Sequence, residues 1–184
     1  MNVNAANALL KVLEEPPQHT ILLLISHQPS RLLPTIRSRC RTLRLNALSQ
    51  ADIDQVLAAQ DLDISPAEMS ALGTLSAGSA GEAIRLAQHQ GPKVYENILA
   101  LLSQAPNIDR PSIINFAEGY AGRTSREDLD ILALMIDRIL SRLAIFGATG
   151  RPPAQLAHQS EINIFAKLCP RPDYAQNWAE LCQE

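Results

Sequence analysis

Residues 21–25 restrict the fold more than any other part of the chain, because five consecutive apolar side chains (ILLLI) lie there between two polar residues. Such a run is typical of a strand buried on both faces of a parallel sheet. The alternating residues 42–45 predict no more than an edge strand. Residues 1–46 therefore lack the neighbours that a buried strand needs, and we expect them to be less ordered and less stable than residues 47–184.

Helical patterns dominate the rest of the chain. A first helix is predicted over residues 4–15, with Asn4 as its N-cap and with Pro16 and Pro17 ending it. A turn and a short helical segment are predicted within residues 29–41. Beyond residue 47 we expect a mainly α fold, with three or four short helices in 47–91 and longer ones near 92–104, 110–120, 125–147, 153–168 and 173–184.

Serine capping signals support these helices. The predicted N-caps are Ser49, Ser65 and Ser125, and an acidic residue stands three positions after each of them, as in a capping box. Pro66 stands at the first helical position after Ser65. The apolar positions of residues 129–143 recur at spacings of three and four, which fits either an internal core or an interface.

Composition excludes several classes of protein. With 46% hydrophobic and 19% charged residues, the chain can bury a core and is not of the disordered type. No apolar run approaches the roughly 20 residues of a membrane-spanning helix, and residues near the N-terminus do not suggest secretion, so we expect neither a membrane span nor a secretory signal. The three cysteines, Cys40, Cys169 and Cys182, have no short spacing, so we expect reduced thiols in a cytoplasmic protein and no metal site.

Charge is concentrated near the N-terminus. Residues 1–45 contain one lysine and five arginines against two glutamates, a net charge of +4, whereas the remaining residues carry −7. The arginine side chain is a rigid fork suited to phosphate and carboxylate. A DNA-binding patch is a rival explanation of the cluster, but only seven aromatic residues occur in the chain and its net charge is −3. The five arginines are Arg31, Arg37, Arg39, Arg41 and Arg44.

Two segments carry a specific resemblance. Residues 4–17 read NAANALLKVLEEPP, residues 29–41 read PSRLLPTIRSRCR, and the second segment includes the triplet Ser38, Arg39 and Cys40. Together they resemble the clamp-loader branch of the AAA+ ATPases, in which this triplet is the SRC motif. The sequence around the triplet is most similar to the delta-prime subunit family of bacterial DNA polymerase III.

This resemblance implies a domain organisation. Residues 1–46 would be the tail of an AAA+ α/β domain, residues 47–91 a helical lid, and residues 92–184 a helical-bundle collar used for oligomerisation. The chain contains no G-x-x-x-x-G-K-[ST] motif and no acidic run after a strand. We therefore interpret it as a C-terminal fragment that lacks the P-loop and Walker B part and whose collar is incomplete.

The resemblance also implies a role for the SRC triplet. In the family, its arginine reaches the γ-phosphate of ATP on a neighbouring subunit, so Arg39 is the candidate arginine finger and Ser38 and Cys40 flank it. A guanidinium supplied in trans stabilises the charge that develops during phosphoryl transfer. No cofactor is expected in this chain, since ATP–Mg²⁺ would be bound by the neighbour. The implied partners are the gamma/tau and delta subunits and, through the complex, the sliding clamp and primed DNA, with no membrane.

Two further positions correspond to nucleotide sensors of the family. Ser26 and His27 follow the predicted strand at the sensor 1 position but depart from its usual threonine pair. The segment GSAGEA resembles the sensor 2 region, where Gly81 stands in place of the usual arginine and Arg85 follows one turn later. Both departures indicate a subunit that does not itself hydrolyse ATP.

Two alternatives remain open at this point. One is a fragment of a gamma/tau-type ATPase, and the other is a non-enzymatic helical adaptor in which the SRC triplet is incidental. No catalytic site of its own is expected, although the family belongs to the DNA-directed DNA polymerase holoenzyme, a nucleotidyltransferase. The acidic pair Glu14 and Glu15 is interpreted as part of a solvated face, and Cys40 as a packing residue.

Overall fold

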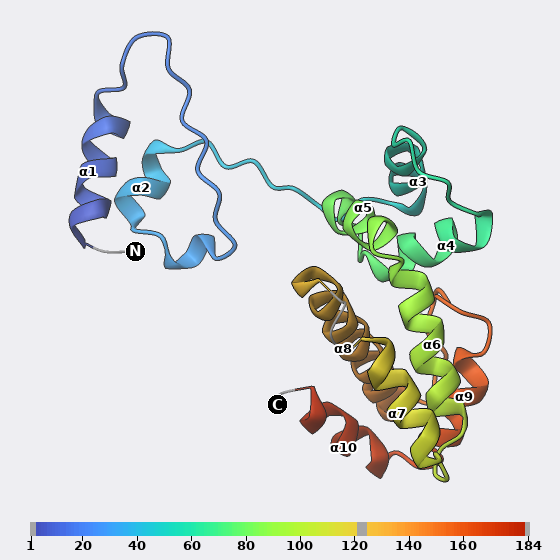
Figure 1. The fold of residues 1–184 in the computed structure, drawn as a ribbon. Coiled ribbons are helices and arrows are strands. Elements are labelled where there is room, and N and C mark those ends of the chain that lie inside the picture. Colours follow the sequence, from blue (N-terminus) through green and yellow to red (C-terminus); the bar gives the residue numbers. More distant parts are fainter. Residues whose placement is uncertain (1–2, 121–124, 183–184) are drawn as a thin grey trace. The chain divides into compact units, whose positions relative to one another are not determined.

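The computed structural model describes residues 3–120 and 125–182 and is mainly helical, with no strand among them (Figure 1). The chain divides into two compact units, Met1–Asn46 and Ala47–Glu184. The division falls where the sequence changes from mixed to purely helical patterns.

The first unit is built on two helices that pack against each other, α1 (Val3–Glu14) and α2 (Pro34–Arg39). A short 3₁₀ helix, η1 (Pro29–Arg31), precedes α2, as the turn signals predicted. The helix α1 begins one residue before Asn4, so Asn4 is not its N-cap. Ile36 of α2 is 1% exposed and anchors this helix.

The predicted strands are absent from this unit. Residues 21–25 have no regular secondary structure, and their exposed fractions alternate between about 40% at positions 22 and 24 and 85–90% at positions 21, 23 and 25. Residues 42–45 are likewise irregular and exposed. The prediction of a buried strand is wrong because, among the described residues, no second strand offers hydrogen bonds or covers the apolar side chains.

The second unit begins with three short helices, α3 (Gln50–Ala58), α4 (Pro66–Leu75) and α5 (Ala80–Gln88). The predicted capping boxes are confirmed at the first two. The Asp52 carboxylate accepts the Ser49 backbone N–H at 3.1 Å, and the Glu68 carboxylate accepts the Ser65 N–H at 2.9 Å. Local side-chain chemistry therefore determines where these helices begin.

Longer helices follow, α6 (Gly91–Ser103), α7 (Arg110–Gly119) and α8 (Arg126–Thr149). The capping box at Ser125 is confirmed, and Gly150 is the C-cap of α8, with a φ of 63° that suits glycine. Two shorter helices complete the unit, α9 (Glu161–Leu168) and α10 (Asp173–Leu181). The prediction of one helix over residues 153–168 is wrong, because only its C-terminal half is helical.

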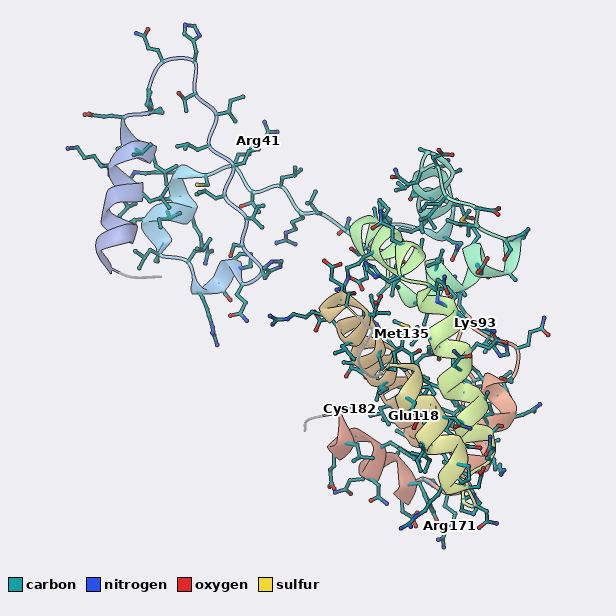
Figure 2. All side chains as sticks on the ribbon, in the orientation of Figure 1. Arg41, Lys93, Glu118, Met135, Arg171 and Cys182 are labelled. Atoms are coloured by element: carbon teal, nitrogen blue, oxygen red, sulfur yellow. The ribbon has the colours of Figure 1, made fainter. Side chains whose placement is uncertain are left out.

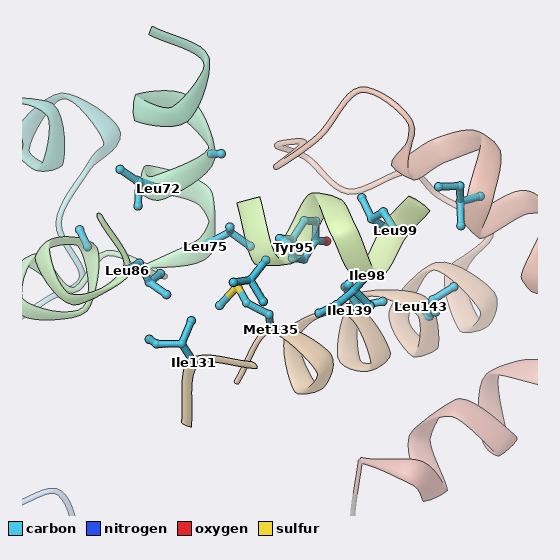
Figure 3. Packing of buried hydrophobic residues seen from close by; sticks show 14 of the residues in the cluster. Leu72, Leu75, Leu86, Tyr95, Ile98, Leu99, Ile131, Met135, Ile139 and Leu143 are labelled. Carbon is cyan, nitrogen blue, oxygen red and sulfur yellow. The ribbon is translucent and has the colours of Figure 1, made fainter. Parts of the chain in front are cut away.

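One core runs through the second unit, with α6 at its centre. Figure 3 shows Tyr95, Ile98 and Leu99 of this helix together with Met135 and Ile139 of α8. The helices α4, α5, α8 and α9 all pack against α6. The stripe on α8 thus faces an internal core through four residues that are at most 1% exposed, namely Ile131, Met135, Ile139 and Leu143.

The helix α10 lies against the C-terminal part of α8. Gly147 of α8 permits this close approach, because a Cβ atom there would lie 2.9 Å from the Cβ atom of Ala175 and 3.3 Å from the Sγ atom of Cys169. In the part of the chain that the structure describes, no helix is both long and apolar enough to cross a membrane.

Candidate functional site

The SRC triplet lies at the C-terminal end of α2. Pro34 occupies the first turn of this helix, where its missing N–H costs nothing, and buried Ile36 holds the helix in place. Arg39 is the last helical residue, and the backbone becomes extended at Cys40, with φ −112° and ψ 138°. The local sequence therefore brings the side chain of Arg39 to the point where the chain leaves the helix.

The guanidinium of Arg39 has two partners in the first unit. Its Nη1 atom donates to the backbone oxygen of Thr35 at 3.1 Å, and its Nη2 atom lies 2.7 Å from Oε1 of Glu14. The side chains of Arg39 and Glu14 are 38% and 50% exposed. An ion pair thus joins the last residue of α1 to the last residue of α2, while part of the guanidinium stays accessible to solvent.

The two residues beside Arg39 have structural contacts. Ser38 Oγ donates to the same backbone oxygen of Thr35 at 3.1 Å. The backbone N–H of Cys40 donates to the oxygen of Arg37 at 3.4 Å, and its free thiol is half-buried. These bonds close the helix end.

The other four arginines of the cluster are exposed and form no ion pair within residues 3–120 and 125–182. Arg31 ends η1, Arg37 lies on α2, and Arg41 and Arg44 lie on the segment that leaves α2, where Arg41 is labelled in Figure 2. Arg39 therefore differs from its neighbours in having a carboxylate partner.

The candidate sensor residues do not gather around Arg39 within one unit. Ser26 and His27 follow the irregular residues 21–25 of the first unit. Gly81 and Arg85 lie on α5 of the second unit, where Nη2 of Arg85 donates to the Glu82 carboxylate at 3.0 Å. A Cβ atom at Gly81 would meet open space, so packing does not require a glycine there.

The prediction that Glu14 and Glu15 belong to a solvated face does not include the ion pair between Glu14 and Arg39, although the Glu14 side chain is 50% exposed. The available signal was that an acidic residue ends one predicted helix while an arginine ends the next, but nothing in the spacing indicates that the two ends meet. Glu15 is exposed and forms no ion pair among the described residues.

Two further charge clusters, both in the second unit, have structural roles. Glu161 is fully buried, and its carboxylate accepts hydrogen bonds from Arg142 and from the backbone N–H groups of Ala157 and His158. Burial raises the pKa of the neighbouring Tyr95 hydroxyl, and the Glu161 charge raises it further. These groups tie α9 and the loop before it to α8.

The second cluster lies at the start of α8. His89 Nδ1 is 2.8 Å from the Asp128 carboxylate, and its Nε2 is 3.5 Å from that of Glu127. The hydrogen bond from His89, followed by those from Ser125, lowers the pKa of Asp128. This contact links the end of α5 to the start of α8.

The described residues of both units also bear on whether a metal or ligand site is present. Within them, no group of three or more histidine, cysteine, aspartate or glutamate side chains is arranged to hold a metal ion. A hollow of about 410 Å³ lies between α6 and α7, and no carboxylate, histidine or cysteine lines it. Among the arginines of the cluster, Arg39 is the one with a carboxylate partner in the described structure.

Comparisons with known proteins find similarity in the part of the chain that contains the SRC triplet. Residues 1–49 match the family model described as DNA polymerase III, delta subunit. The chain is 50% identical over 109 residues to DNA polymerase III subunit delta′ of Pseudomonas aeruginosa, an alignment that covers 56% of this chain and 33% of the relative. It is 39% identical over 111 residues to subunit delta′ of Escherichia coli, an alignment that covers 60% of this chain and 33% of the relative. The resemblance to the delta-prime subunits is confirmed over these parts.

Similarity extends to another subunit of the same polymerase. The gamma subunit of Buchnera aphidicola is 36% identical over 87 residues, which cover 45% of this chain and 24% of the relative. The matches span about a third of the length of the delta′ relatives. No solved structure matches the chain at a significant level.

Proposed function

We propose that the chain acts in DNA replication as part of a delta-prime-like clamp-loader subunit of DNA polymerase III. In this proposal it assembles with gamma/tau and delta subunits and supplies Arg39 to the ATP–Mg²⁺ bound by a neighbouring gamma/tau subunit. ATP turnover there loads the sliding clamp on primed DNA. The chain itself holds no nucleotide.

One observation carries this proposal. Arg39 ends α2 within the segment that matches the delta subunit family model, and its side chain is 38% exposed. Two of its five N–H donors are engaged, by Thr35 and Glu14, so three remain for an anion. The guanidinium therefore keeps donor capacity for a phosphate in addition to these two contacts.

The chemistry explains why an arginine is useful there. In ATP hydrolysis a water oxygen bonds to the γ-phosphorus while the bond from that phosphorus to the β–γ bridging oxygen breaks. The products are ADP, phosphate and a proton. Negative charge spreads over the equatorial oxygens in the transition state, and the fixed guanidinium stabilises it.

The domain assignment belongs to the same proposal. Residues 1–46 would be the tail of the AAA+ α/β domain, residues 47–91 the lid and residues 92–184 the collar. Five exposed apolar side chains on α7 and α8 would be available for contacts with other subunits in a collar. They are Ile113, Ile114, Leu129, Ile136 and Ile145.

The test uses the full-length gene product in a complex reconstituted with gamma/tau and delta subunits. The corresponding arginines of the gamma/tau subunits are replaced, so that only the ATP site facing this chain can turn over with a finger. The R39A substitution should then lower DNA-stimulated kcat by roughly 10³-fold or more, the range known for arginine fingers. R37A, which removes an exposed arginine two residues away, should leave kcat unchanged, and an unchanged rate with R39A would refute the finger.

A second candidate function is a gamma/tau-type ATPase, favoured by the similarity to a gamma subunit. Gly81 argues against a gamma/tau-type ATPase, because a catalytic relative is expected to have an arginine at that position. Equilibrium binding of ATP to the isolated full-length product separates the two. Tight binding supports the ATPase, and its absence supports the delta-prime-like subunit.

A further inference from the structure

We propose that Glu14 is a positioning residue for Arg39, holding its guanidinium ready for the phosphate of a neighbouring subunit. This inference rests on the proposed function, because it concerns how the finger is aimed. It assigns a role to a carboxylate that would otherwise count as solvated surface.

The contact comes from two helix ends that meet. Glu14 is the last residue of α1, and Arg39 is the last residue of α2, which packs against α1. Buried Ile36 fixes α2 from one turn earlier. Both partners of the 2.7 Å ion pair therefore extend from packed helices rather than from loops.

Two attachments restrict the arginine side chain. The Thr35 oxygen holds Nη1 from its own helix, and Glu14 holds Nη2 from the neighbouring helix. A free arginine samples many rotamers, and ordering it costs conformational entropy when the phosphate arrives. A guanidinium already held in one orientation avoids that cost at the moment of reaction.

The geometry favours positioning over sequestration. A sequestered arginine would be covered, with its donors used up. Here the side chain is 38% exposed, and the Nε donor and one further N–H on each terminal nitrogen have no partner in the described structure. Removing Glu14 should therefore slow the reaction rather than release an inhibited finger.

The chain offers a matched control in Glu15. It is adjacent to Glu14 and exposed, and it forms no ion pair among the described residues. E14Q and E15Q remove the same charge from neighbouring positions and keep the side-chain shape. Exposed ion pairs contribute little to stability, so both variants should fold. Equal thermal unfolding midpoints for the two variants and the parent protein would verify this.

The experiment is performed in the same reconstituted complex, with only the ATP site facing this chain functional. We expect E14Q to lower kcat roughly threefold to tenfold, with KM for ATP unchanged because the neighbour binds the nucleotide. E14D, which keeps the charge on a shorter side chain, should restore part of the rate. E15Q should behave as the parent protein.

The R39A variant distinguishes failure of the proposed function from failure of the positioning role of Glu14. If R39A leaves kcat unchanged, the proposed function fails and the positioning role fails with it. If R39A lowers kcat while E14Q matches or exceeds the parent rate, positioning alone is overturned. E14Q should cause no additional loss in the R39A background, and an additional loss there would show that Glu14 acts through something other than Arg39.

Discussion

The Glu161 carboxylate is fully buried and is bound by the guanidinium of Arg142, whose side chain is only 18% exposed. The guanidinium also donates through Nη2 to the backbone oxygen of Gln155 at 2.7 Å. This pair fastens α9 and the irregular loop before it to α8. It is the most deeply buried ion pair among the described residues.

Replacing Arg142 with alanine should therefore destabilise the second unit strongly. The substitution leaves a buried carboxylate without its counter-charge, which typically costs about 3–5 kcal/mol. Urea unfolding followed by circular dichroism measures the loss. Lys93, which pairs with Glu96 at an exposed site, provides the control, and K93A should change the free energy of unfolding by no more than about 0.5 kcal/mol. Similar losses for both variants would contradict the structural role of the buried pair.

Two isoleucines of α8 test the position of the core. Ile139 is 1% exposed and Ile145 is 62% exposed, although both lie on the same helix. I139A should cost about 2–5 kcal/mol because it leaves a cavity, whereas I145A should cost about 0.5 kcal/mol or less. Chemical denaturation of both variants gives the comparison. A larger loss of unfolding free energy for I145A than for I139A would mean that α8 buries a different face.

The contact between His89 and Asp128 predicts a dependence of stability on pH. Hydrogen bonds from His89 and Ser125 hold the pKa of Asp128 below its ordinary value of 3.8, so folding favours the charged carboxylate. Its stabilising effect is fully present above pH 3.8 and is lost as the pH falls through the lowered pKa.

The unfolding temperature of D128N measured from pH 7 down to pH 3 tests this. At pH 7, D128N should unfold at a lower temperature than the parent protein. The difference between the two unfolding temperatures should narrow as the pH falls under 3.8. D130N removes one charge from an exposed position of the same helix and serves as the control. A difference in unfolding temperature that does not narrow between about pH 5 and pH 3 would contradict the lowered pKa of Asp128.

Backbone amides of residues 21–25 should exchange with solvent within the shortest labelling times. The structure gives them no backbone hydrogen bond, and their side chains are largely exposed. Amides in α6 and α8, which enclose the core, should be the most protected. Hydrogen exchange with mass spectrometry measures both, and equal protection in the two units would contradict the expected lower stability of residues 1–46.

Sequence reasoning succeeded where the deciding interactions are local. Ser49 with Asp52 and Ser65 with Glu68 lie three residues apart, so their capping boxes could be predicted from spacing alone. The SRC triplet could likewise be found, because it is a contiguous motif within the matched segment.

Interactions between distant residues could not be predicted in the same way. Residues 21–25 have the pattern of a strand, but a strand exists only where a partner supplies hydrogen bonds. Residues 153–160 have helical character, yet Arg142 and Glu161 bind the backbone there at positions 155, 157 and 158. The Glu14–Arg39 pair depends on how two helices pack, which neither helix encodes by itself.

The central place of α6 also has a thermodynamic consequence. Its buried residues belong to the same apolar cluster as those of α3–α5 and of α8 and α9. If either α3–α5 or the pair α8 and α9 lost its packing on α6, apolar surface of the other set of helices would also be exposed. Heat should therefore melt residues 47–184 in one cooperative step, with a calorimetric enthalpy equal to the van't Hoff enthalpy, rather than melting residues 47–91 and 92–184 in succession.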